Sequence, residues 1–186
     1  MSWPEIAFIA LLFFWFSLLV LLTRWPSVRI KSISQHSASF KSSFLFFTTV
    51  QVVVGVITYL FIIRWFIPQF HLPLLFTILY SLTAWLQIIS AFIPDSGKSL
   101  NHRLHQYLAY PFALGMLFIL ILLCLTTTIH GWPKLFTYIS TAYIAGSVLA
   151  TISKKGRPHV MSNYLPLQLL YIISFQLTVL AITFYK

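Results

Sequence analysis

Six apolar stretches of about twenty residues, separated by polar connections, constrain this chain more than any other feature. A hydrocarbon core of about 30 Å requires roughly 20 helical residues to cross it, and each stretch is close to that length. The stretches cover about 5–22, 44–63, 72–93, 107–129, 135–151 and 165–185. Strands of a membrane barrel would alternate apolar and polar residues, which the run 112–125 does not do. The sequence therefore predicts an all-α integral membrane bundle of six transmembrane helices.

Charged residues are too few for a water-soluble protein of this length. Only 8% of the 186 residues are charged, whereas 59% are hydrophobic. A soluble domain could not cover its surface with that composition. No segment has the composition of a separate soluble domain, so we expect a single transmembrane helical domain over residues 1–186.

The basic residues are concentrated in alternate connections, which predicts the orientation of the chain. Nine of the 12 lysines and arginines lie in the connections after the first, third and fifth helices: Arg24, Arg29, Lys31, Lys41, Lys98, Arg103, Lys154, Lys155 and Arg157. The positive-inside rule places these connections in the cytoplasm and both termini on the non-cytoplasmic side. The longest polar connection, residues 23–43, is expected to lie on the lipid headgroups as an amphipathic segment or to be irregular.

The same charge pattern indicates the partners and the location of the protein. The net charge of +10 is explained by topology and by contact with anionic headgroups, and nucleic-acid binding is not expected because no soluble basic domain is present. We expect a multi-pass protein of the plasma (inner) membrane whose partners are membrane lipids. A homo-oligomer or a complex with another membrane protein also remains open.

Polar residues within the apolar stretches form a candidate ligand pocket. Polar side chains inside a bilayer usually turn toward protein or water. Gln51 lies in the second stretch, Gln87 and Ser90 in the third, and Gln168 and Tyr171 in the sixth. These residues either hold the helices together or line a cytoplasm-facing pocket that binds a lipid or a small amphiphile.

Asp95, His102 and His105 form the candidate catalytic cluster, in the connection between the third and fourth helices. Asp95 is one of only two acidic residues in the chain. A carboxylate beside two imidazoles can hold a divalent metal, relay protons or act as an acid and a base. In the alternatives, Asp95 pairs with Arg103 or Lys98 while the histidines lie in the interface, or the cluster contacts a lipid headgroup.

The remaining histidines do not predict a haem site. His105 and His130 end the same predicted helix, and their 25-residue separation corresponds to about 37 Å. That distance places the two imidazoles at opposite membrane surfaces instead of on facing helices. Phosphate-binding glycine loops and the usual zinc and redox motifs are also missing from the sequence, so we expect no cofactor.

The segment Phe92-Ile93-Pro94-Asp95, followed by a histidine at 102 or 105, resembles a motif of the DUF998 family of six-helix membrane proteins. That family tends to carry a Phe-(Ile)-Pro-x-Asp type motif after its third helix and a histidine near the start of the fourth. It is similar in architecture to the Frag1/DRAM/Sfk1 membrane proteins. The resemblance is specific across about fifteen residues, implies the six-helix fold, and implies no settled activity.

Two main functions are compatible with these observations. The first is a polytopic membrane protein that binds a lipid or amphiphile in the polar pocket or supports membrane partners. The alternative is a membrane-embedded lipid-modifying enzyme that uses Asp95 with His102 and His105 as metal ligands or as an acid–base pair. A transporter is less favoured, since the apolar stretches carry none of the charges that usually drive coupled transport. The sequence leaves open whether the protein is an enzyme.

Overall fold

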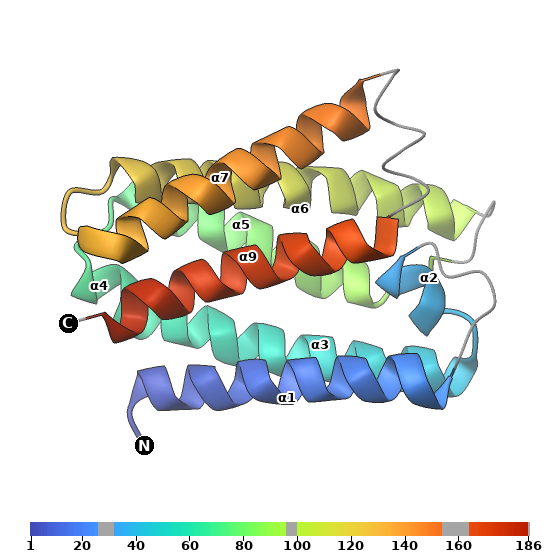
Figure 1. Ribbon diagram of the computed structural model, residues 1–186. Helices are drawn as coiled ribbons and strands as arrows, with labels where there is room; N and C mark the ends of the chain where they lie inside the picture. The colour runs from blue at the N-terminus through green and yellow to red at the C-terminus, as the bar shows by residue number, and fades with distance from the viewer. Residues whose placement is uncertain (26–31, 96–99, 154–163, 186) are drawn as a thin grey trace.

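The computed structural model describes residues 1–25, 32–95, 100–153 and 164–185 (Figure 1). Its helical elements are α1 (Trp3–Arg24), α2 (Ile33–Ser37), α3 (Lys41–Phe61), η1 (Ile62–Phe66), α4 (Ile67–Gln69), α5 (Leu74–Ala91), α6 (Leu100–Leu125), α7 (Gly131–Ile152) and α9 (Tyr164–Phe184). The all-α prediction is thereby confirmed for the described part of the chain.

Within the described ranges, five helical segments are long and apolar enough to cross a membrane. They are α1, the continuous segment Lys41–Gln69, α5, α6 and Leu165–Phe184 of α9. Large apolar side chains point outward from them, with Phe16 64% exposed and Leu74 74% exposed. An apolar surface of this extent is unusual for a protein in water but suits hydrocarbon surroundings. The structure is consistent with an integral multi-pass membrane protein.

Helix boundaries differ from the sequence prediction where a helix begins in polar sequence. The segment predicted at 107–129 is α6, which already begins at Leu100 and ends at Leu125. The segment predicted at 135–151 is α7, which begins at Gly131. The predicted boundaries followed the apolar runs alone. A first turn of polar residues can be helical without lying in hydrocarbon, so these two helices begin earlier than predicted. The segments predicted at 5–22, 72–93 and 165–185 agree with α1, α5 and α9 within two residues.

The segment predicted at 44–63 is longer in the structure because a π-helical turn continues it. This turn, η1, joins α3 to α4, and the N–H of Ile67 donates to the carbonyl of Ile62, five residues back. Pro68 follows and has no N–H to donate to the Arg64 carbonyl. The wider turn therefore lets the helix pass into a proline-containing end and extend to Gln69.

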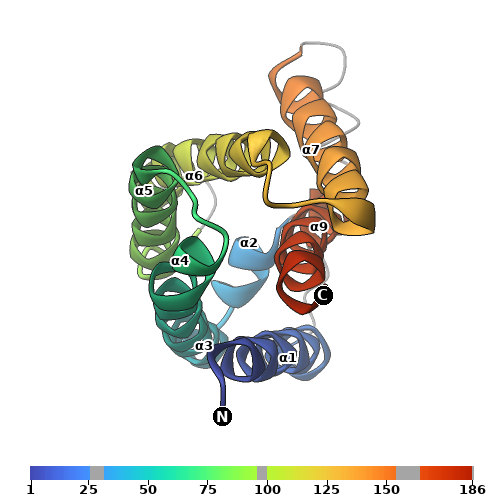
Figure 2. The ribbon, with the colours of Figure 1, turned by 90° about the vertical axis from the view of Figure 1, so that its left-hand side faces the viewer.

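The helices run side by side along one direction (Figure 1). Viewed end-on, α1, α3, α5, α6 and α9 surround a common axis, and α7 packs outside the others against α6 and α9 (Figure 2). Both chain termini lie at one end of the bundle together with α4. We call this the terminal end, and the opposite end, which carries α2 and the connection between α5 and α6, the α2 end.

Small residues and hydroxyls hold the helices close together. A Cβ atom added to Gly115 of α6 would lie only 2.2 Å from the hydroxyl oxygen of Thr83 on α5, so this contact requires glycine. On the other side of the bundle, the Thr178 hydroxyl of α9 donates to the Ser140 hydroxyl of α7 at 3.0 Å. Such close approaches matter in lipid, where apolar surface alone gives helices little reason to associate.

Short α2 fills the α2 end of the bundle instead of lying on its surface. Ile33 and His36 are buried at 2% and 1% exposure. Ser32 caps the helix by accepting from the N–H of Gln35 at 3.0 Å, and the N–H of Ile33 donates to the Gln168 side chain at 3.0 Å. The described part of the 23–43 connection thus packs against the helices, contrary to the expected surface-lying segment.

Candidate functional site

Asp95 lies in the connection between α5 and α6 at the α2 end. Helix α5 ends at Ala91, and Pro94 keeps the chain from resuming a helix immediately. Although it lies in a connection, Asp95 is only 7% exposed. A buried carboxylate is costly unless it has hydrogen-bond partners, so the surroundings of Asp95 must supply them.

The first turn of α6 supplies a partner for this carboxylate. His102 Nδ1 donates a hydrogen bond to Asp95 Oδ1. On the other side of the ring, the Gln106 amide nitrogen donates to His102 Nε2 at 3.0 Å. Because a carboxylate only accepts and the amide N–H₂ only donates, this network assigns the ring proton to Nδ1 and a lone pair to Nε2.

His105 makes a second link one turn further along α6. Its Nδ1 donates to the backbone carbonyl of Ile93 at 3.0 Å. His102 and His105 are three residues apart and therefore share a face of the helix. Each joins the start of α6 to the residues that follow α5, so one role of the pair is to fasten the α5–α6 hairpin.

The geometry suits acid–base chemistry better than metal binding. The Asp95 carboxylate accepts from Nδ1–H of His102 and so orients the imidazole. The same carboxylate would stabilise the imidazolium that forms when Nε2 takes a proton. Among the described residues, no group of three or more His, Cys, Asp or Glu side chains is placed to hold a metal ion. The proposed metal-ligand role of Asp95, His102 and His105 therefore has no geometric support in this part of the chain.

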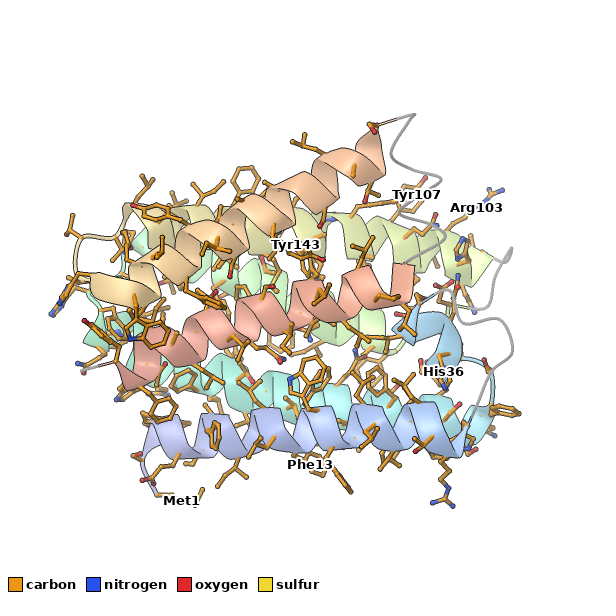
Figure 3. The ribbon with its side chains drawn as sticks, viewed as in Figure 1. Met1, Phe13, His36, Arg103, Tyr107 and Tyr143 are labelled. Carbon is orange, nitrogen blue, oxygen red and sulfur yellow. The ribbon has the colours of Figure 1, made fainter. Side chains whose placement is uncertain are left out.

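Exposed cations lie at the same end of the bundle as the site. Arg103 and Tyr107 of α6 are exposed and point away from the bundle (Figure 3). Arg24 and Lys41 are also exposed, at the ends of α1 and α3 nearest α2. Asp95 pairs with His102 and not with Arg103, while Lys98, the other expected partner, lies outside the described residues. The positive surface favours anionic headgroups next to the site.

Two of the five residues predicted to line a ligand pocket, Gln168 and Tyr171, link separate elements. Gln168 of α9 accepts from α2, as described above, and the Tyr171 hydroxyl donates to the Ala113 carbonyl of α6 at 2.7 Å. Ser90 donates to the carbonyl of Gln87 within α5 at 2.8 Å. Gln51 is half-buried and does not hydrogen-bond to Gln87. The contacts of Gln168 and Tyr171 match the alternative in which polar residues hold the helices together.

Gln106 and His36 were missed by the sequence analysis. Gln106 is four residues after His102, a spacing that puts both on one helix face, but the apolar stretch of the fourth helix begins only at residue 107 while α6 begins at Leu100. His36 lies in polar sequence that gives no sign of burial. Its Nε2–H donates to the Leu21 carbonyl at 3.1 Å, while its Nδ1 is buried with no hydrogen-bond partner among the described residues.

Comparison with known proteins adds no further evidence on this site. The chain was compared with known protein families, with curated proteins and with solved structures, and none of them matches. The resemblance of residues 92–105 to the DUF998 motif therefore stays a prediction. The functional argument depends on the geometry around Asp95.

Proposed function

We propose that this chain is a six-span membrane protein that carries out acid–base chemistry on a lipid or another amphiphile at the cytoplasmic membrane surface. The observation that carries the proposal is the hydrogen bond from His102 to the buried Asp95 carboxylate. In the reaction, Nε2 of His102 accepts a proton from a substrate hydroxyl or a water, and Asp95 stabilises the resulting charge. The resemblance to the DUF998 motif supports placing the site at these residues.

The sixth span in this proposal is α7. Its 22 residues extend about 33 Å at 1.5 Å per residue, enough to cross the hydrocarbon core. An even number of crossings accounts for both termini lying at one end of the bundle. The basic residues of the alternate connections support a cytoplasmic location for the α2 end. A reporter fused after Lys186 should give an extracytoplasmic signal, and a cytoplasmic signal would reverse the orientation.

The test of the chemistry begins with purified protein reconstituted into vesicles of phosphatidylcholine, phosphatidylethanolamine and phosphatidylglycerol. Lipids are analysed by mass spectrometry and phosphorus NMR before and after incubation. We expect the wild-type chain to form a modified lipid and His102→Ala to form none. Added imidazole should restore part of the lost activity, because it replaces the missing ring, and a merely structural role of His102 would not respond to it.

Matched variants separate the chemistry from folding. Asp95→Asn should lower the activity strongly while the protein still elutes as a folded species, since the amide cannot stabilise an imidazolium. His71→Asn should keep full activity, because His71 is exposed at the terminal end and its φ of 50° suits asparagine. Equal activity of wild type and His102→Ala would refute the acid–base proposal.

A second candidate function is headgroup binding without chemistry, favoured by the exposed cations beside the site. In that case the wild-type protein forms no product in the vesicle assay. An anionic lipid co-purifies with it, and both His102→Ala and Arg103→Gln lose that lipid. The two candidates thus give different results in one set of preparations.

A further inference from the structure

The nitrogen that acts as the base in the proposed function already has a hydrogen-bond partner. The Gln106 amide nitrogen lies 3.0 Å from His102 Nε2 and donates to its lone pair. A neutral imidazole has only one nitrogen that accepts, and a substrate O–H group that gives its proton to Nε2 must use the same lone pair. Substrate and Gln106 therefore compete for one position, and the Gln106 amide has to move before the reaction begins.

Gln106 is not needed to set the tautomer of His102. The Asp95 carboxylate only accepts hydrogen bonds, so its contact with His102 already places the ring proton on Nδ1. The bond from Gln106 adds nothing to that assignment. Its position at the reacting nitrogen indicates a role in the reaction.

The burial of the site shows from which side a substrate would approach. The side chain of Asp95 is 8% exposed, whereas that of His102 is 25% exposed. Because Nδ1 of His102 faces the buried carboxylate, the accessible part of the ring is on its other edge, which carries Nε2. Gln106 is half-buried on this edge. A substrate that reaches His102 therefore meets the Gln106 amide first.

After it leaves Nε2, the Gln106 amide stays within reach of the reacting oxygen. Side chains four residues apart on a helix are neighbours, with Cβ atoms about 5–6 Å apart. A hydroxyl group has one hydrogen to donate and two lone pairs to accept with, so a single oxygen can donate to His102 and accept from Gln106. An ammonium group has no lone pair and cannot take this position.

We infer that Gln106 is a second catalytic residue, whose amide donates to the substrate oxygen while that oxygen gives its proton to His102. The inference rests on the proposed acid–base function. In this step the O–H bond breaks, the proton goes to Nε2, and the electron pair stays on the oxygen. The amide N–H then stabilises the negative charge that develops there. The substrate class is an O–H group, from a lipid headgroup or from water.

Gln106→Met tests this role in the vesicle assay. Methionine keeps a long unbranched side chain and removes the donor. Loss of one such donor typically lowers kcat about 10²–10³-fold, and we expect a loss of about 100-fold with little change in KM. Gln69→Leu should keep the wild-type rate, because Gln69 is exposed at the terminal end. A purely structural role would instead reduce the folded fraction and leave the kcat of the folded protein unchanged.

Two further variants keep the test decisive if Gln106→Met does not fold. Gln106→Glu has the same shape but a carboxylate that only accepts, so it should lose activity to a similar extent. Gln106→Asn keeps an N–H₂ donor and should recover part of the rate. Wild-type kcat in folded Gln106→Met or Gln106→Glu would overturn the inference.

The outcomes separate this inference from the proposed function. If the wild type is active and Gln106→Met is equally active, Gln106 has no catalytic role, while the acid–base function stands. If the wild type forms no product, the acid–base function fails and the role of Gln106 fails with it. Reactions in ¹⁸O-labelled water identify the O–H group: a labelled product indicates water, and an unlabelled product indicates a headgroup hydroxyl. Either source supports the inference, because both groups donate and accept.

Discussion

Gly115→Ala is expected to weaken the contact between α5 and α6. The added Cβ would lie 2.2 Å from the Thr83 hydroxyl oxygen and 3.2 Å from the Thr83 Cβ and Cγ2 atoms. Thr83 cannot simply move away, since it is 4% exposed and its hydroxyl donates to the Leu79 carbonyl at 2.7 Å. The helices must therefore separate, or Thr83 must give up both its rotamer and its hydrogen bond.

The size of the effect follows from two opposing contributions. Alanine in place of glycine within a helix stabilises it by about 1 kcal/mol. Overpacking of a buried contact costs about 1–3 kcal/mol, and a 2.2 Å approach to a β-branched side chain belongs at the upper limit. We expect Gly115→Ala to lower the free energy of unfolding by about 2 kcal/mol, which corresponds to roughly 4–8 °C in Tm.

The assay is unfolding in mixed detergent micelles, followed by circular dichroism, with two other helical glycines for comparison. A Cβ on Gly146 would meet no atom within 4 Å, so Gly146→Ala should be neutral or stabilising. A Cβ on Gly55 would lie 3.3 Å from Ile88 Cγ1, so Gly55→Ala should fall between the other two.

A double variant tests the assigned cause. Thr83→Ala removes the hydroxyl and the methyl group that the new Cβ would strike. Combined with Gly115→Ala, it should be at least about 1 kcal/mol less destabilising than the sum of the single effects. Additive effects, or a Gly115→Ala protein as stable as Gly146→Ala, would refute the reasoning about this contact.

Three further variants test other contacts by the same unfolding assay. Lys134 donates to the Thr126 carbonyl at 2.6 Å near the end of α6, so Lys134→Met should cost about 1–2 kcal/mol, and Lys134→Arg should recover part of that loss. Thr178→Val removes the hydrogen bond to Ser140 at nearly constant volume and should cost about 0.5–1 kcal/mol; no loss would show that packing alone holds α7 there. His71→Gly should stabilise the protein by up to about 1 kcal/mol, because glycine adopts a φ of 50° without strain, and a destabilised variant would contradict this assignment.

The positions of the long helices were predictable because the bilayer fixes both length and polarity. Apolar runs such as 5–22 and 165–185 therefore matched α1 and α9 closely. Short α2 was not predictable from these rules, because its five residues carry no apolar periodicity. It forms where Ser32 can cap it and Gln168, more than a hundred residues away, can accept its first N–H. Contacts across that separation are set by tertiary packing.

The candidate site was predictable in composition but not in pairing. The rarity of acidic residues made Asp95 a candidate, and the two histidines that follow it, His102 and His105, completed the predicted cluster. Which histidine meets the carboxylate depends on how the start of α6 is placed relative to Asp95, and no local rule fixes that placement. Gln51 and Gln87, both predicted to line the pocket, do not hydrogen-bond to each other. Between the same two helices, the Thr48 hydroxyl instead donates to the Ala91 carbonyl at 2.8 Å.

The hydrogen bonds around His102 allow its charge to change with little movement. When Nε2 takes a proton, the Nδ1–H bond to Asp95 and the His105 bond to the Ile93 carbonyl are both retained, because those nitrogens stay donors. The Gln106 amide then faces the ring with its N–H₂ group, and a half-turn about its last side-chain torsion presents the oxygen instead. Proton uptake and release would therefore rotate the Gln106 side-chain amide, while α5 and α6 keep their spacing.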